Sequence, residues 1–180
     1  MDRAAKVERK TKETDILVEL QLDGGEIVLD TGIGFFDHML HAFAFYGGLG
    51  LTVQAKGDLQ VDGHHTVEDV GIVLGDALRG AFGEKTGIRR FASAYVPMDE
   101  ALLFAALDVS GRPYLVFDAP MPQERCGEYD TCLTVEFMRA FAMHAALTLH
   151  MKAFYGANAH HITEGLFKAL GLALKDAKRV

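Results

Sequence analysis

A five-residue pattern, His-His-x-x-Glu, occurs twice in this sequence, at His64–Glu68 and at His160–Glu164. Imidazole nitrogen and carboxylate oxygen are ligands of first-row transition metals, and the spacing of ligands is the part of a metal site that cannot vary freely. The second copy begins more than half the length of the chain after the first. The sequence therefore predicts two related metal-binding segments in two related halves of the fold.

The similarity between the halves extends to both sides of the pattern. Residues 38–44 (HMLHAFA) align with residues 136–142 (EFMRAFA), and the series Leu-Gly-x-Ala-Leu follows each pattern. Self-similarity at a long fixed spacing indicates repeated structural units. We therefore expect an internal duplication.

Hydrophobic periodicity predicts the elements of each repeat. Strands are expected over residues 16–22, 27–29, 49–54, 91–96, 102–109, 114–117 and 147–151, and helices over residues 35–43 and 70–78 with counterparts in the second half. The first two strands flank Asp23-Gly24-Gly25 and are expected to form a β-hairpin. The predicted fold class is α+β, a tandem duplication of a small β-sheet plus two helices of the ribosomal protein S5 domain 2-like kind. The repeats are expected at residues 1–87 and 88–180, packed as one globular unit.

Composition excludes several classes of function. The formal charge is −7 and the 18 Lys and Arg residues are scattered, so no basic stripe is present for nucleic acid. Apolar runs such as Ala101–Leu107 are far shorter than the roughly 20 residues of a membrane span. Cys126 and Cys132 suit neither a redox pair nor a thiolate zinc site. We expect a soluble, cytoplasmic protein with two unpaired thiols and no nucleic-acid or membrane partner.

The geometry of the repeated pattern predicts how the ligands divide. Adjacent histidines at the start of a helix point about 100° apart, whereas a Glu three or four residues further on shares a face with one of them. Each pattern should therefore give one His and the Glu to one metal ion and the second His to another. Two copies then predict two ions, each with ligands from both repeats.

Other histidines support this prediction in part. Glu136 occupies the place in the second repeat that His38 has in the first. A ligand set of imidazole and carboxylate without thiolate favours Mn, Fe or Zn in a site that is not purely structural. His41 and His144 are interpreted as ordinary helix residues, and the role of His150 stays open.

The residues alone leave more than one function open. The leading alternatives to a metal-dependent lyase are a non-catalytic metal-dependent assembly protein and a metallohydrolase. Three basic residues, Arg90, Arg112 and Lys168, would ordinarily be solvated charges.

Six motifs together carry a resemblance to a known family. They are Arg9–Thr14 (RxTxET), Phe36–Leu40 (FDHML), Asp62–Asp69 (DGHHTVED), Asp99–Ala101 (DEA), Ser110–Tyr114 (SGRPY) and Asn158–Glu164 (NAHHxxE). In this order, over residues 6–176, the sequence resembles the imidazoleglycerol-phosphate dehydratase family. The resemblance implies a hydro-lyase of L-histidine biosynthesis that converts D-erythro-imidazole glycerol phosphate to imidazole acetol phosphate. It also implies two Mn²⁺ per active site and a homo-oligomer of 24 subunits with active sites shared between chains.

The resemblance also implies roles for individual residues. The metal ligands would be His38, His64, His65, Glu68, Glu136, His160, His161 and Glu164. One partition places His64, Glu136, His160 and Glu164 on one ion and His38, His65, Glu68 and His161 on the other. Arg90, Arg112 and Lys168 match positions that hold the substrate phosphate, and Glu13, His38, His64, His65, Glu68 and His160 would also bind substrate. The catalytic residues would be Glu13, Asp99 and Glu164.

Two positions depart from the family pattern. Position 136 is Glu where some relatives carry His, and the sequence ends at Lys178-Arg179-Val180 where the family usually continues into a Ser-Thr-Lys-Gly tail.

The chemistry of the implied reaction agrees with a duplicated metal site. The proton to be removed lies on a carbon beside an imidazole ring, and no carbonyl is present to stabilise a carbanion. A ring held between two divalent ions can lose its N–H and expel the hydroxyl through an imidazolate and a diazafulvene intermediate. A carboxylate such as Glu13 would then move protons over hydrogen-bond distances.

Overall fold

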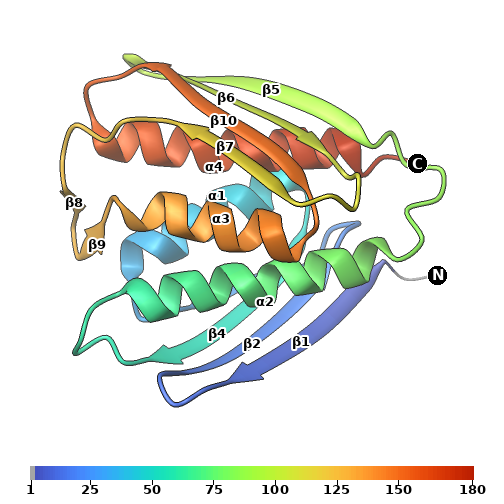
Figure 1. The fold of residues 1–180 in the computed structure, drawn as a ribbon, viewed down its shortest axis with the longest axis horizontal. Helices are drawn as coiled ribbons and strands as arrows, with labels where there is room; N and C mark the ends of the chain where they lie inside the picture. The colour runs from blue at the N-terminus through green and yellow to red at the C-terminus, as the bar shows by residue number, and fades with distance from the viewer. Residues whose placement is uncertain (1–2) are drawn as a thin grey trace.

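The computed structural model describes residues 3–180, which form two four-stranded sheets with helices between them (Figure 1). The first repeat consists of β1 (Ala4–Lys10), β2 (Thr14–Gln21), β3 (Ile27–Asp30), α1 (Gly34–Gly47), β4 (Gly50–Gly57) and α2 (His64–Phe82). The second consists of β5 (Phe91–Met98), β6 (Ala101–Asp108), β7 (Tyr114–Asp118), α3 (Leu133–His144), β10 (Thr148–Tyr155) and α4 (Ala159–Ala177), with β8 (Arg125–Cys126) and β9 (Tyr129–Asp130) before α3. The predicted α+β fold with two repeats of a sheet and two helices is confirmed.

The two sheets share one topology, as expected of duplicated units. Their strand orders are β1-β2-β4-β3 and β5-β6-β10-β7. In each sheet one pair is parallel, β3 with β4 and β7 with β10, and the other pairs are antiparallel. Parallel neighbours need a crossover connection, and α1 and α3 provide it.

The predicted hairpin between residues 16–22 and 27–29 is wrong. β2 pairs with β1 on one side and with β4 on the other, so β3 lies beyond β4 at the far edge of the sheet. β4 takes the central place because its alternate residues Leu51 and Val53 are buried against the helices. The strand that forms a hairpin with β2 is β1. The sequence does not predict β1, because most of its side chains are charged and exposed, and no alternation of apolar and polar residues is visible.

The predicted helices are present, and their ends follow from local sequence. α1 ends at Gly47, and the next residue, Gly48, has a φ of 58°, the left-handed conformation that glycine adopts at little cost. α2 begins at His64, and α4 begins one residue before His160. The side chain of Asn158 caps α4 by accepting the His160 N–H. Both repeated patterns therefore lie in the first turn of a helix.

The helices pack across the boundary between repeats, α1 against α4 and α2 against α3. Glycines allow both close contacts. A Cβ on Gly171 of α4 would lie 2.6 Å from the Phe43 carbonyl oxygen of α1, and a Cβ on Gly75 of α2 would lie 2.8 Å from the Phe141 carbonyl oxygen of α3. This exchange of partners brings α1 of the first repeat to the metal-binding pattern of the second.

The helices themselves are amphipathic elements of a packed core. None of the helices in residues 3–180 is long and apolar enough to cross a membrane.

Candidate metal centre

In each repeated pattern the first histidine faces the glutamate one turn further on. His160 Nε2 lies 3.1 Å from Glu164 Oε2, and His64 Nε2 lies 3.5 Å from Glu68 Oε2. The second histidine turns outward, to a carboxylate outside its own pattern: His65 contacts Asp58 and His161 contacts Glu100. The assignment of the two histidines of each pattern to two different ions stays a prediction.

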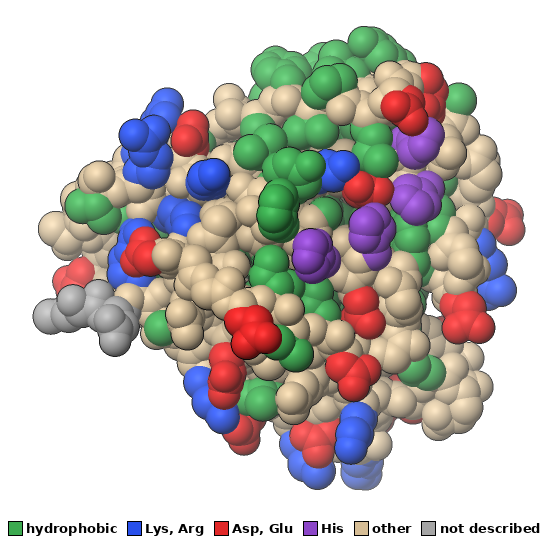
Figure 2. Space-filling view, turned by 180° about the vertical axis from the view of Figure 1, so that it is seen from behind, with side chains coloured by type: hydrophobic (Ala, Val, Ile, Leu, Met, Phe, Trp, Pro, Cys, Tyr) green, Lys and Arg blue, Asp and Glu red, His purple; other side chains and the backbone are tan. Residues whose placement is uncertain are grey.

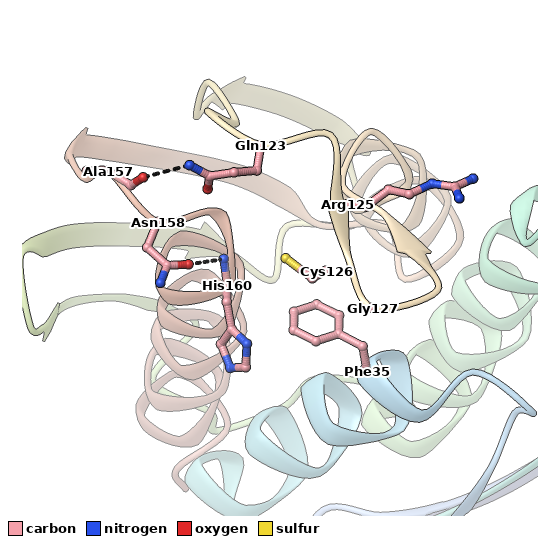
Figure 3. A pocket seen from close by; sticks show the side chains of 8 residues that line it. All are labelled: Phe35, Gln123, Arg125, Cys126, Gly127, Ala157, Asn158 and His160. Carbon is pink, nitrogen blue, oxygen red and sulfur yellow. Dashed lines mark hydrogen bonds between the residues drawn. The ribbon is translucent and has the colours of Figure 1, made fainter.

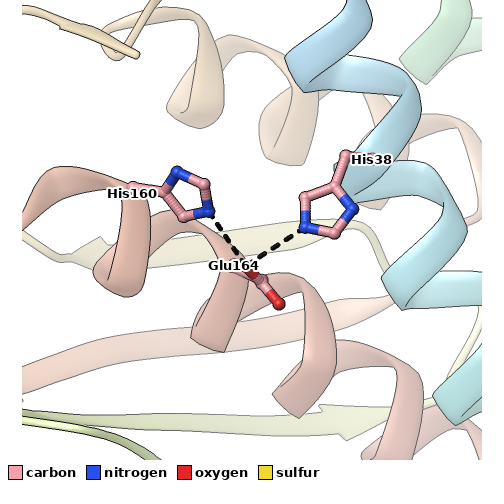
Figure 4. Close-up of side chains that lie close together, drawn as sticks. All are labelled: His38, His160 and Glu164. Atoms are coloured by element: carbon pink, nitrogen blue, oxygen red, sulfur yellow. Dashed lines mark hydrogen bonds and ion pairs between the residues drawn. The ribbon is translucent and has the colours of Figure 1, made fainter.

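The contact between α1 and α4 assembles a three-residue group from both repeats. His38 of α1 joins His160 and Glu164 of α4, and one ligand atom from each lies within 4.8 Å of the others (Figure 4). His38 Nε2 is 3.3 Å and His160 Nε2 is 3.1 Å from the same oxygen, Glu164 Oε2. Two ligands on bonds of about 2.1 Å at angles of 90–109° are about 3.0–3.4 Å apart. The donor set and its spacing therefore fit a divalent ion.

Glu164 is buried, and the ammonium of Lys168 favours its ionised form. Burial opposes its ionisation, but the ammonium of Lys168 and the ring of His38 outweigh burial and lower the pKa of Glu164. Lys168 Nζ lies 2.7 Å from Glu164 Oε1, and the ammonium also lies over the ring of Tyr46. One carboxylate oxygen thus faces Lys168, and the other faces the histidines.

Each of the two outward-turned histidines contacts a carboxylate through Nδ1. His65 Nδ1 is 2.9 Å from Asp58 Oδ2, and His161 Nδ1 is 2.7 Å from Glu100 Oε2. The hydrogen bond with Asp58 raises the pKa of His65, and that with Glu100 raises the pKa of His161. The contact with His161, followed by the Ala157 N–H, lowers the pKa of Glu100 to about 2. Sequence reasoning missed the roles of Asp58 and Glu100, because both lie in loops without a spacing rule.

Several histidines form a row along one face, with carboxylates beside some of them (Figure 2). Three histidines that are not proposed as ligands lie outside the three-residue group. His41 stacks on Phe45, His144 contacts Asp76 through Nδ1 at 3.0 Å, and His150 is exposed on β10. These contacts agree with the interpretation of His41 and His144 as ordinary helix residues.

The observed grouping differs from the partition suggested by the resemblance. That partition separates His38 from His160 and Glu164, whereas the structure brings the three together because α1 packs on α4. Glu136 of α3 makes an ion pair with Arg139, one turn away on the same helix. Within residues 3–180, Glu136 is not part of a three-residue group of potential ligands.

The basic residues expected to hold phosphate lie in two places. Arg90 and Arg112 both face Asp108, with Nε of Arg90 at 2.7 Å and an Nη of Arg112 at 3.8 Å. Arg112 is largely exposed. Lys168 instead contacts Glu164. A single chain therefore shows a pair of arginines beside one carboxylate, and a lysine at the histidine group.

The two candidate proton-moving carboxylates lie in hairpin turns near the outward histidines. Glu13 is exposed directly before β2, and its charge contributes to raising the pKa of His65. Asp99 lies in the β5–β6 turn with a φ of 47°, and its Oδ2 is 3.7 Å from His161 Nε2. Each turn thus places a carboxylate beside one repeated pattern.

A cavity of about 440 Å³ lies beside the ring of His160 (Figure 3). Phe35 contacts that ring edge-on, with the ring centroids 5.0 Å apart. Gln123 closes another side, where its amide donates to the Ala157 carbonyl and accepts the Ala159 N–H. Cys126 also lines the cavity, and burial raises the pKa of its thiol. The cavity gives a small molecule access to one side of the histidine group.

Comparisons with known proteins identify the family of the chain. A family model described as imidazoleglycerol-phosphate dehydratase matches residues 31–174. The chain is 59% identical over 180 residues to an imidazoleglycerol-phosphate dehydratase of Acetivibrio thermocellus, covering 99% of this chain and 92% of the relative. It is 58% identical to that of Symbiobacterium thermophilum, covering 98% and 85%. The crystal structure of imidazoleglycerol-phosphate dehydratase from Staphylococcus aureus superposes with a TM-score of 0.91 at 38% identity, covering 98% of this chain and 99% of that one. The chain belongs to the imidazoleglycerol-phosphate dehydratase family.

Proposed function

We propose that this chain dehydrates D-erythro-imidazole glycerol phosphate to imidazole acetol phosphate in L-histidine biosynthesis, with two Mn²⁺ ions per active site. Family membership supports the reaction. The observation that carries the metal is the group formed by His38, His160 and Glu164. Its two imidazoles and one ionised carboxylate suit a borderline ion such as Mn²⁺, and no thiolate is present to favour a softer one.

The duplication suggests how the remaining ligands divide. The repeat counterparts of His38, His160 and Glu164 are Glu136, His64 and Glu68, and the contact between α2 and α3 is the counterpart of that between α1 and α4. We assign these residues to the second ion. His65 and His161, which turn away from the ligands of their own patterns, would complete the two coordination shells from neighbouring copies of the chain.

The two ions, when bound, would supply the positive charge that lowers the cost of removing the imidazole N–H proton. The protein residues perform the other tasks. Glu13 and Asp99 lie in turns beside the outward histidines, where a carboxylate can take a proton from substrate carbon and return one to product. Lys168 keeps Glu164 ionised. Glu13 and Asp99 would therefore move protons, and Glu164 would bind a metal ion.

Arg90 and Arg112 are suited to the phosphate of the substrate. Both guanidinium groups face Asp108, so the phosphate would replace or share contacts that the structure gives to one carboxylate. Arginine binds phosphate through two parallel N–H groups, which fixes orientation as well as charge. An assembly protein held together by metal has no need of such a pair.

We also propose that the protein forms a cytoplasmic homo-oligomer of 24 subunits with shared active sites. One chain gathers three of the eight proposed ligands in residues 3–180, so completion by a neighbour explains the exposed histidines. The outer face of the sheet β5-β6-β10-β7 carries exposed aromatic residues that contact one another, with the ring of Tyr95 4.8 Å from Phe104 and 5.8 Å from Phe154. Apolar patches of this kind commonly mark contacts between proteins.

The test is to supply imidazole glycerol phosphate to metal-stripped and Mn²⁺-reconstituted protein and to follow formation of the ketone product. We expect turnover in the reconstituted protein alone. Glu13→Gln is the matched control, because it should retain manganese and lose turnover. A reconstituted wild-type protein that binds manganese and assembles without turnover would refute the dehydratase and support the metal-dependent assembly protein.

A further inference from the structure

In each His-His-x-x-Glu pattern the second histidine, His65 or His161, contacts a carboxylate outside the proposed ligand set. Both contacts involve the same ring nitrogen, Nδ1. Both oxygens of Asp58 face Nδ1 of His65, at 2.9 and 3.2 Å. One oxygen of Glu100 faces Nδ1 of His161 at 2.7 Å. The two histidines are repeat counterparts, and they share this geometry.

The two carboxylates are not repeat counterparts. Asp58 directly follows β4, and the residue that directly follows the matching strand β10 is Gly156. Glu100 directly precedes β6, and the residue that directly precedes the matching strand β2 is Glu13. The same contact has thus been built from two different positions, so it is not simply inherited from one ancestral repeat. A shared requirement of the two histidines accounts for it.

The two oxygens of Glu100 have different partners. Its Oε1 accepts the N–H groups of Ala157 at 3.0 Å and Asn158 at 2.9 Å, directly before α4. Its Oε2 is left for His161. Asp58 is mostly buried, with 15% of its side chain exposed, whereas 45% of His65 is exposed. Burial therefore fixes Asp58, whereas Glu100, with 39% of its side chain exposed against 25% for His161, is fixed by its two backbone N–H contacts.

The contact determines which nitrogen of the ring carries the lone pair. A neutral imidazole has one N–H and one lone pair. When Nδ1–H donates to a carboxylate, the lone pair is on Nε2, and the ring can bind a metal only through that atom. His38, His64 and His160 also direct Nε2 toward a glutamate. All five of these proposed ligand histidines would then bind through the same nitrogen.

We propose that Asp58 and Glu100 are positioning residues that fix the tautomer and ring direction of His65 and His161, so that each offers Nε2 to a metal ion that its neighbour in the pattern does not bind. This inference rests on the metal site of the proposed function. Outer carboxylates of this kind usually change metal affinity by about 10–100-fold when removed. The two residues would serve the two ions separately, because each holds one histidine.

The experiment compares full-length Asp58→Asn and Glu100→Gln with wild type. An amide can donate to Nδ1 as well as accept from it, so the replacement permits the tautomer with its proton on Nε2. Free Mn²⁺ is titrated by its electron paramagnetic resonance signal, and the ring ¹⁵N shifts of the metal-free proteins, recorded at alkaline pH where the rings are neutral, report the tautomer. We expect each variant to bind one class of Mn²⁺ about 10–100-fold more weakly and to show a changed tautomer at one histidine.

Two controls separate positioning from loss of charge. Asp62→Asn removes the same charge from the same loop, where Asp62 accepts the backbone N–H of His64 and Asn is an equally good acceptor. Glu124→Gln removes a charge from an exposed loop of the second repeat. Both should keep wild-type affinity. Asp58→Glu, which retains a carboxylate, should recover part of the affinity that Asp58→Asn loses.

The outcomes distinguish the inference from the function on which it rests. Wild-type protein that binds no Mn²⁺ would refute the metal site itself. Wild-type binding together with unchanged affinity and unchanged ring shifts in Asp58→Asn and Glu100→Gln would overturn the positioning role and leave the metal site intact. Because ring shifts are read without metal, they test the tautomer even if a variant binds manganese too weakly to titrate.

Discussion

The contact between α1 and α4 at Gly171 should control both stability and the metal site. A Cβ at Gly171 would lie 2.6 Å from the Phe43 carbonyl oxygen and 3.0 Å from the Gly47 nitrogen, and both are backbone atoms of α1. Ordinary Cβ contact begins near 3.4 Å, so in Gly171→Ala the two helices must separate by about 0.8 Å, the difference between 3.4 and 2.6 Å. Since His38 lies on α1 and its two partners lie on α4, the separation should widen the three-residue group.

The expected energetic effect is moderate. Overpacking of a close contact costs about 1–3 kcal/mol. Alanine is about 1 kcal/mol better than glycine in a helix interior, which offsets part of that cost. We therefore expect Gly171→Ala to lower the free energy of unfolding by up to about 2 kcal/mol, the larger cost less the helix term, and to weaken Mn²⁺ binding as well. Gly75→Ala, at the equivalent contact of α2 with α3, should lose similar stability, because its Cβ would meet Phe141 oxygen at 2.8 Å.

Urea unfolding of metal-free protein and Mn²⁺ titration test this prediction together. The matched control is Gly80→Ala, an exposed position in α2 whose added Cβ would contact only the Cβ of Ala5, at 3.3 Å. Gly80→Ala should be neutral or slightly stabilising and should keep its metal. If Gly171→Ala were as stable as Gly80→Ala and bound manganese as tightly as wild type, the argument that helix separation sets the site would be refuted.

Four further predictions follow from the site. Glu68→Gln should abolish turnover and lower manganese content measured by mass spectrometry, and an unchanged metal stoichiometry would remove Glu68 from the ligands. Arg112→Ala should raise KM by about 10–100-fold with a smaller change in kcat, because one charge-assisted phosphate contact is worth about 1.5–3 kcal/mol. Steady-state kinetics in which only kcat changed would contradict this expectation. In metal-free protein, Asp58 raises the pKa of His65 and Glu100 raises the pKa of His161, so both pairs stabilise the fold fully below the unfolded pKa of about 6.5 and lose that effect as pH rises through the raised values. Thermal unfolding from pH 5.5 to 8.5 should show this loss in wild type and less of it in Asp58→Asn, and parallel profiles would argue against it. Chelation at low pH should reduce the mass seen by light scattering, since protonated histidines release metal, and a constant mass would show assembly to be independent of metal.

Local structure was largely predictable from the sequence because it depends on near neighbours. The helix over residues 35–43 followed from apolar spacing and from Gly48, and the inward and outward histidines followed from the 100° turn between adjacent helical residues. The pairing of β3 with β4 was not predictable in this way. It depends on which strand fills the centre of the sheet, and Asp23-Gly24-Gly25 reads locally as a hairpin turn.

The three-residue group depends on contacts that no local rule contains. His38 meets α4 because Gly171 allows α1 to approach, and these two residues are far apart in sequence. Asp58 and Glu100 were missed for a related reason, since a loop carboxylate carries no spacing signal. Lys168 was assigned to phosphate by resemblance, whereas its contact in one chain is with Glu164. The types of residue in the site were therefore more predictable than the contacts between them.

The exchange of helix partners between repeats has a consequence for how such a chain could arise. A single ancestral repeat would have an α1-type and an α2-type helix with no partner of its own, and two copies related by a two-fold axis would satisfy both. Such a dimer would contain two identical metal sites, each with one histidine or glutamate donated by the other copy. Fusion of the copies into one chain removes that identity. It permits His38 at one site and Glu136 at its counterpart, so that two ions facing a single asymmetric substrate can differ.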